Sequence, residues 1–340
     1  MLRYERVAAI VEAAMSEWRF DLVPGPAAGA KAEGRVDWGD PVLAGWEWPY
    51  VAVNGAAPGP AVLVTAGIHG SEYCSIDAAI RLGAALEPER VRGQLLCLPV
   101  MNPSAFWERA AYVSPVDNLN LNRVFPGKPT GSFSERVAHH LTQKAIRRAD
   151  AYIDMHGGDI PEALVPFTIY QESGRRELDA KSAAMAEAFG SPALLVQRDA
   201  EAPVSGLAYA TAAAFDVPAI LVEDGGAGRY DAAIAGRMLE GVENVLRSLE
   251  VLPGGARNLP PPRRFERFSW IRSEAAGFFR HEIEVGEDVA AGQRLGRLVD
   301  FHGAEIEEVR TPDAGRVLFL VVSPAIGRKG LICGIGVGAG

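Results

Sequence analysis

The fold is decided by residues 62–72, which read VLVTAGIHGSE. An apolar, β-branched run of buried-strand length ends in a histidine flanked by glycines, and a helical pattern begins after Glu72. A turn that enters a helix can aim residues three positions apart at one point, so His69 and Glu72 can share a ligand. Neutral histidine and a carboxylate are normal ligands of catalytic zinc. The stretch therefore predicts part of a metal site at the carboxyl end of a core strand.

A second stretch has the same design. Residues 151–158, AYIDMHGG, form another apolar strand pattern that ends in histidine followed by glycine. His156 is the predicted third ligand, because two histidines and one glutamate leave a zinc position open for water, as in catalytic sites. The alternative is that each histidine is an ordinary hydrogen-bonded residue, since an H-x-x-E pattern is common by chance. The repeated placement favours the metal.

A third apolar run, at residues 218–222, ends in Glu223 before two glycines are reached. The carboxyl ends of parallel strands meet at one edge of a sheet, so Glu223 should lie beside the two histidines. A carboxylate next to an open zinc position can take a proton from the bound water. Glu223 is therefore the predicted general base.

His139 and His140, on a helical pattern at 134–145, are predicted surface residues.

The composition limits the kind of protein. The chain has 340 residues, of which 48% are hydrophobic, enough for a full core and two domains. A net charge of −9 argues against nucleic-acid or anionic-membrane partners. The three cysteines lie far apart and indicate no disulfide framework, which favours a cytoplasmic protein. No apolar run approaches about 18 residues and no secretory signal is recognisable, so we expect neither a membrane span nor secretion.

Strand and helix patterns alternate along most of the chain. Residues 1–34 are predicted as an N-terminal helix and a Pro/Gly-rich linker, followed by a strand within 42–53. Residues 35–252 predict an α/β domain with a mixed, mostly parallel sheet flanked by helices. After a linker at 253–264, short strands between glycine turns predict a small all-β domain at 265–340.

Residues 102–127 are predicted as a long polar loop at the carboxyl edge of the sheet. Such loops carry binding groups. The arginine of the pair Asn122-Arg123 offers a planar fork of donors and the asparagine a neutral one, which suits a substrate carboxylate. The alternative is a solvated turn with a surface arginine.

Together, these motifs resemble the succinylglutamate desuccinylase/aspartoacylase family, a branch of the zinc metallocarboxypeptidase fold. The resemblance runs from about residue 40 to residue 250 and rests on HGSE at 69–72, NP at 102–103, NLNRVFPG at 120–127, DMHGG at 154–158 and Glu223. It implies that one zinc ion per chain is held by His69, Glu72 and His156. It also implies that Glu223 is the base and that Asn122 with Arg123 binds a substrate carboxylate.

The chain departs from this family at one position. Family members carry an arginine directly before the aromatic residue that corresponds to Tyr112, and this sequence has Ala111 there. Arg109, two residues earlier, is the candidate that takes over the polarisation of the scissile carbonyl.

The C-terminal part is similar to a biotinyl/lipoyl-like β-domain appended to such enzymes, with GEDVAAGQ at 286–293 and TPDAGRV at 311–317. Carrier domains hold a modified lysine on a hairpin turn, but residues 306–310 contain none. We therefore expect a structural cap or an assembly surface without attached lipoate or biotin.

The predicted function is zinc-dependent hydrolysis of the amide bond of a small N-acyl amino acid. The sequence leaves a homo-oligomer open. A zinc carboxypeptidase acting on peptides would use the same residues. A non-catalytic zinc-binding scaffold is the other alternative, although it gives Glu223 no reason to occupy the third strand end.

Overall fold

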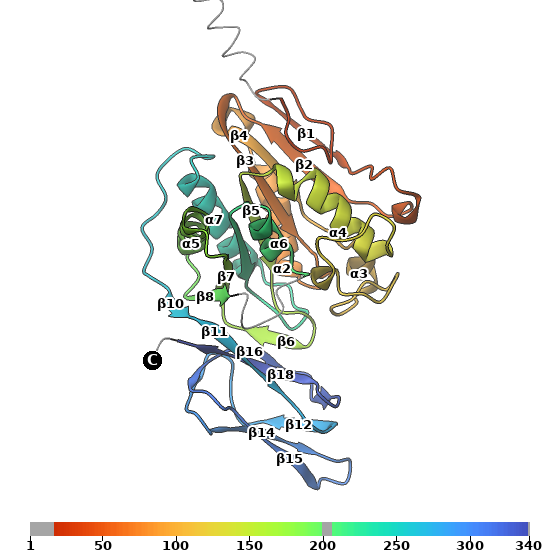
Figure 1. Cartoon of the computed structure of the whole chain (residues 1–340), viewed down its shortest axis with the longest axis vertical. Coiled ribbons are helices and arrows are strands. Elements are labelled where there is room, and N and C mark those ends of the chain that lie inside the picture. Colours follow the sequence, from red (N-terminus) through yellow and green to blue (C-terminus); the bar gives the residue numbers. More distant parts are fainter. Residues whose placement is uncertain (1–16, 199–205, 339–340) are drawn as a thin grey trace, which may run out of the picture.

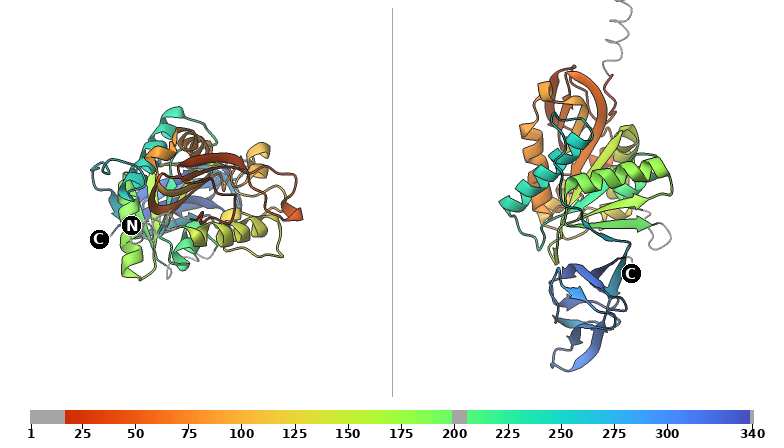
Figure 2. Two further views of the ribbon diagram at one scale, coloured as in Figure 1. Left: turned by 90° about the horizontal axis from the view of Figure 1, so that it is seen from above. Right: turned by 90° about the vertical axis from the view of Figure 1, so that its left-hand side faces the viewer.

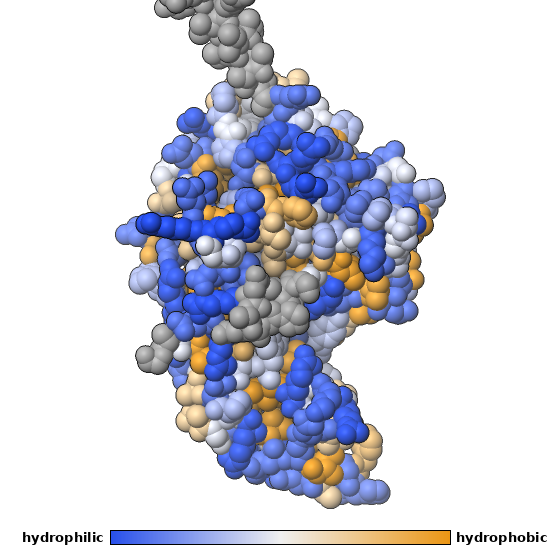
Figure 3. Space-filling model, viewed as in Figure 1, coloured by the Kyte–Doolittle hydropathy of each residue, from blue (hydrophilic) through white to orange (hydrophobic). Residues whose placement is uncertain are grey.

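The computed structural model describes residues 17–198 and 206–338, which form a large α/β domain above a smaller β-domain (Figure 1). Most of the predicted N-terminal helix lies outside the described residues. Figure 2 shows the β-domain below the end of the large sheet, and the surface in Figure 3 is mostly hydrophilic and narrows where the two parts meet. None of the helices in the described ranges has the length and apolar character needed to cross a bilayer.

The large sheet has nine strands in the order β1-β2-β4-β3-β5-β9-β7-β8-β10. Five neighbouring pairs are parallel and three are antiparallel. This confirms the predicted mixed, mostly parallel sheet. The strands are β1 Ala30–Arg35, β2 Pro49–Asn54, β3 Ala57–Ala66, β4 Arg92–Leu98, β5 Ala151–His156, β7 Phe167–Glu172, β8 Ala193–Arg198, β9 Ala219–Glu223 and β10 Arg263–Phe265.

Helices cover both faces of this sheet. Val62 and Val64 of β3 pack toward α2 (Tyr73–Ala85), α5 (Arg176–Phe189) and α7 (Ala232–Ser248). Leu63, between them, packs with the other face, which α4 (Phe133–Lys144) and α6 (Ala208–Ala214) cover. Successive side chains of a strand point to opposite faces, so a strand that is covered on both sides reads as a continuous apolar run. The central strands were therefore predictable from their composition.

The β-domain consists of two small sheets. One contains β11 (Arg267–Arg272), β18 (Leu331–Val337), β16 (Gly315–Val321) and β13 (Asp288–Val289), and the other contains β15 (Glu305–Arg310), β14 (Arg294–Val299), β12 (Gly277–His281) and β17 (Ala325–Ile326). Their pairs are antiparallel, which confirms the predicted all-β architecture. A further strand, β6 (Glu162–Leu164), comes from the large domain and pairs with β16. The two domains therefore share backbone hydrogen bonds.

The structure differs from the sequence prediction at several short elements. The segment predicted as a loop contains helix α3 (Pro103–Glu108), which Asn102 caps by accepting a hydrogen bond from the Ala105 amide. An asparagine N-cap before a proline is a signal for the start of a helix. A helix of six residues, however, is too short to show a helical period of apolar residues in the sequence. Strand β1 begins in the predicted N-terminal linker, and β10 begins in the predicted linker at 253–264. Both are edge strands, which need little apolar sequence.

Candidate active site

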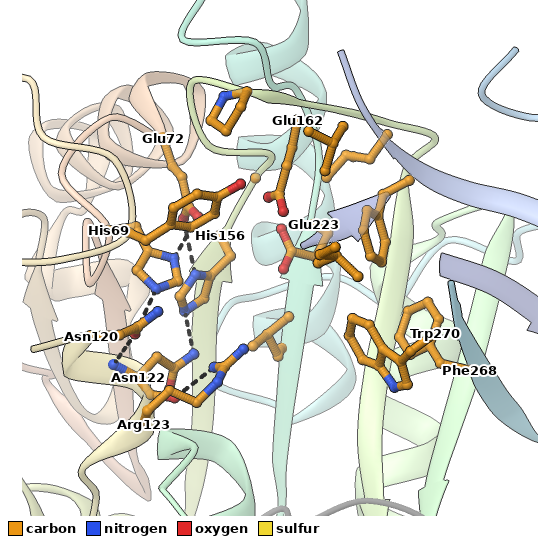
Figure 4. A pocket seen from close by; sticks show the side chains of 18 of the residues that line it. His69, Glu72, Asn120, Asn122, Arg123, His156, Glu162, Glu223, Phe268 and Trp270 are labelled. Atoms are coloured by element: carbon orange, nitrogen blue, oxygen red, sulfur yellow. Dashed lines mark hydrogen bonds and ion pairs between the residues drawn. The ribbon is translucent and has the colours of Figure 1, made fainter. Parts of the chain in front are cut away.

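Three neighbouring strands deliver the predicted site residues to one edge of the large sheet. His69 lies just after β3, and Glu72 is the N-cap residue of α2. His156 ends β5, whose register places it directly beside Glu223 at the end of β9. Figure 4 shows all four side chains pointing into one cavity.

The donor atoms of His69, Glu72 and His156 converge. The Nδ1 atom of His69 lies 2.7 Å from Oε1 of Glu72, and Nδ1 of His156 lies 2.9 Å from Oε2 of the same carboxylate. One ligand atom from each of the three residues lies within 4.8 Å of the others. Oε2 of Glu72 is buried, and the His156 ring is the group that faces it at 2.9 Å. Such a cluster of ligand atoms fits a cation at its centre.

The other side of the His69 ring indicates its tautomer. Nε2 lies 3.1 Å from Oδ1 of Asn120, and the same oxygen accepts the backbone N–H of Asn122 at 2.9 Å. Since this oxygen is an acceptor, His69 carries its proton on Nε2 and leaves a lone pair on Nδ1, the atom that faces Glu72. A second partner that fixes the ring and its tautomer is typical of metal-bound histidine.

His156 has a similar second partner. Its side chain is 1% exposed, and its Nε2 lies 3.4 Å from Oδ2 of Asp154 and 3.4 Å from Nδ2 of Asn122. Asp154 is in turn held by the Thr65 hydroxyl, which donates to Oδ1 at 2.9 Å. A carboxylate behind a histidine that faces a shared centre is the arrangement found around zinc. The residues present therefore fit a metal ion.

The charges of the donor group are strongly coupled. Burial raises the pKa of the Glu72 carboxyl, but His156 and His69 outweigh burial and bring that pKa down to about 2. Burial disfavours the charged His156 ring, yet Glu72 and Asp154 raise its pKa well above the usual range. The negative potential that attracts a proton to these nitrogens attracts a metal cation in the same way.

Glu223 lies beside this group without belonging to it. Its Oε2 atom is buried and has no hydrogen-bond partner among the described residues. Burial, and then the Glu72 carboxylate, raise the pKa of Glu223 well above its usual range. A carboxyl group with a raised pKa and a free oxygen can exchange a proton with a molecule in the cavity.

Asn122 and Arg123 are also brought to the cavity. Asn122 is fixed by the Ala208 amide, which donates to its Oδ1 at 2.9 Å, and Arg123 donates from Nη1 to the Asn122 carbonyl at 2.7 Å. Burial lowers the pKa of Arg123, and no ion pair of the described residues involves it. An arginine that lines the cavity and has no ion-pair partner among the described residues suits an anionic ligand.

Arg109 is not brought to the site. It ends helix α3 in a left-handed conformation, with φ of 53°, and its side chain is exposed. It does not line the cavity, whose cationic side chains are Arg123 and Arg272. The short helix that the sequence did not predict turns this arginine outward, whereas Tyr112, three residues later, does line the cavity.

The cavity has a volume of about 600 Å³ and both domains line it. The β-domain contributes an aromatic cluster in which Phe268 and Trp270 lie 4.7 Å apart between ring centroids and Phe319 contacts both. Sequence reasoning missed these residues. Their only signal was an aromatic residue at alternate positions of one short strand, a pattern that also describes ordinary packing.

Residues 58–249 match the model of the succinylglutamate desuccinylase/aspartoacylase catalytic domain. The chain belongs to this family. The matched range contains all the residues of the candidate site that come from the large domain, including Glu223 and Arg123.

Relatives of this desuccinylase/aspartoacylase chain cover most of its length. A curated N-alpha-acetyl-L-2,4-diaminobutyric acid deacetylase from Halomonas elongata is 28% identical over 256 residues, which are 74% of this chain and 73% of that protein. The product-bound structure of the ectoine utilization protein EutE (DoeB) from Ruegeria pomeroyi is 27% identical, with a TM-score of 0.79 over 86% of this chain and 89% of that one.

A succinylglutamate desuccinylase/aspartoacylase structure from Rhodobacter sphaeroides is 25% identical, with a TM-score of 0.83 over 94% of this chain and 99% of that one. This similarity extends over the β-domain as well as the large domain. The two-domain arrangement is therefore shared with solved members of the family.

Proposed function

We propose that the protein is a zinc-dependent amidohydrolase that removes the acyl group from a small N-acyl amino acid. The observation that carries the proposal is the convergence of His69, Glu72 and His156 beside Glu223, whose buried Oε2 atom has no hydrogen-bond partner among the described residues. Two histidines, one carboxylate and a neighbouring base are the parts of a catalytic zinc site.

Zinc held by these three residues would make a bound water acidic and would stabilise the charge that develops on the carbonyl oxygen. Glu223 takes the proton of the attacking water and then returns it to the nitrogen of the leaving amine. Its Oε2 atom is buried, which limits the competition of bulk water for that proton. The products are a carboxylic acid and the free amino acid.

Asn122 and Arg123 give the substrate its orientation. The guanidinium of Arg123 binds the free carboxylate of the amino acid, and Asn122 holds Arg123 through its carbonyl oxygen. The deacetylase activity of the Halomonas relative on an acylated amino acid supports this class of substrate. The β-domain residues that line the cavity favour a small substrate over a peptide.

Variants of two arginines test which of them takes part in the reaction. We expect Arg123→Ala to raise KM by about ten- to hundredfold, because the substrate carboxylate loses its hydrogen bonds to the charged guanidinium. Arg109→Ala is the matched control and should leave KM and kcat close to wild type, since this side chain is exposed outside the cavity. Steady-state kinetics on one N-acyl amino acid measures both. A large loss of kcat in the Arg109 variant would return Arg109 to the mechanism.

The test of the function is primary-amine release from acetyl, succinyl and other N-acyl amino acids, with and without a metal chelator. We expect at least one compound to be hydrolysed, chelation to abolish the activity and added zinc to restore it. Cleavage of peptides without turnover of any N-acyl amino acid would replace the proposal with a carboxypeptidase. Zinc binding without hydrolysis of either class would indicate a non-catalytic role.

A further inference from the structure

A second carboxylate, Glu162, faces the cavity, and the proposed reaction does not use it. Glu162 lines the cavity at the start of β6, and Figure 4 shows its carboxylate pointing toward that of Glu223. In the same view, Arg123 lies on the other side of Glu223. The cavity therefore has a cationic end, a central reacting region and an anionic end.

The backbone of Glu162 is held from two sides. Its carbonyl accepts the Ala227 amide at 2.6 Å, and a Cβ atom on Gly226 would lie only 2.3 Å from that oxygen. On its other side, Glu162 pairs with Val321 of strand β16 in the β-domain. A side chain on such a fixed backbone is preorganised for binding.

Glu162 is half-buried, and its carboxyl group forms no ion pair within the described residues. Its hydrogen-bond partners are the Asp159 amide, at 3.4 Å, and the Tyr112 side chain. Tyr112 is itself positioned by Asp159, whose Oδ2 accepts the Tyr112 amide at 2.7 Å. Burial raises the pKa of Glu162. A half-buried carboxylate that faces a cavity without an ion-pair partner suits a cationic group of a ligand.

The rest of this cavity suits a cation as well. The aromatic rings of Phe268 and Trp270 line it, and ring faces attract ammonium groups. Arg272, the second arginine of the lining, donates to the Lys329 carbonyl instead of pairing with Glu162.

We propose that Glu162, together with the Tyr112 hydroxyl, binds a cationic nitrogen on the side chain of the substrate. The preferred substrates are then N-acyl amino acids with a positively charged side chain, whose carboxylate lies at Arg123, whose amide lies by Glu223 and whose ammonium lies at Glu162. This inference rests on the proposed function and specifies which substrates the enzyme prefers.

The test compares two substrates of the same size on the wild type and on Glu162→Gln. N-acetyl-L-2,4-diaminobutyrate carries a terminal ammonium where N-acetyl-L-norvaline carries a methyl group. We expect the wild type to prefer the diaminobutyrate derivative, and Glu162→Gln to raise KM for it by about ten- to hundredfold. The KM for the norvaline derivative should change little. Tyr112→Phe, which removes one hydroxyl, should shift the same KM in the same direction by less.

Equal losses on both substrates would overturn the proposal, because they would make Glu162 a general structural or chemical residue. Equal efficiency of the wild type on both would overturn it too. If neither acetyl compound released an amine, the result would count against acetyl substrates in the proposed function and not against the role of Glu162. Calorimetric binding of free L-2,4-diaminobutyrate and L-norvaline would then decide the role of Glu162, since a preference for the diamino acid that Glu162→Gln removes supports the proposal and no preference rejects it.

Discussion

Replacing Glu223 by glutamine should lower kcat by at least about a hundredfold, the usual contribution of a general base, while the zinc content stays at one ion per chain. Glutamine keeps the size and the strand position of Glu223 but cannot accept the proton of the attacking water. The effect belongs in kcat, because the substrate carboxylate is bound elsewhere, at Arg123. Single-turnover kinetics together with metal analysis of the purified variant measures both quantities.

Asp224→Asn is the matched control for this variant. Asp224 follows Glu223 directly and is buried, but it does not line the cavity, and its carboxylate accepts two hydrogen bonds of 2.8 Å from Arg237. The substitution removes the same charge one residue away, so kcat should remain near wild type. A Glu223→Gln enzyme with near-normal kcat would remove Glu223 from the mechanism. A similar loss in both variants would point to general electrostatics.

The ends of the core strands could be predicted from sequence because local signals agree there. His69, His156 and Glu223 each end an apolar run and are followed within two residues by glycine, and such runs are strands that both helix layers cover. Parallel strands align their carboxyl ends, so three local patterns gave one site. No long-range information was needed beyond the assumption that these strands are neighbours, which the order β3-β5-β9 satisfies.

The other wall of the cavity could not be predicted in this way. Phe268 and Trp270 reach the site because β6 pairs with β16, an association between segments far apart in the chain. Strand β6 has only three residues, all half-buried, so no alternation of apolar and polar residues predicts it. The β-domain was expected to be a cap or an assembly surface. Its position at the cavity supports a role in substrate recognition. The sequence does not reveal this role, because its aromatic pattern fits ordinary packing equally well.

Arg109 shows the limit of transferring a role by proximity in sequence. It lies two residues from the position where the family carries its arginine, but a displacement of two residues at a helix end changes the direction of a side chain completely. Helix α3 ends at Glu108 and the left-handed turn at Arg109 sends the chain back toward Tyr112. Tyr112 therefore reaches the cavity while Arg109 does not.

His156→Ala should lose tight metal binding and, with it, nearly all turnover. The variant removes one of three donors and leaves the Glu72 and Asp154 carboxylates buried without the ring between them. Loss of a residue that only supports a metal ligand costs about ten- to hundredfold in affinity, so loss of a ligand should cost more. Competition with a chromophoric chelator measures the affinity, and circular dichroism of the metal-free wild type provides the folding reference.

The control for this variant is His139→Ala, because His139 lies on α4 outside the donor group and should leave metal content unchanged. A fully metallated His156→Ala protein would reject the ligand assignment, whereas a protein that fails to fold even with zinc would be replaced in the test by His156→Gln. The Glu223 and His156 variants should both lose turnover, but only the His156 variant should lose the metal. That difference separates the group that holds zinc from the group that moves the proton.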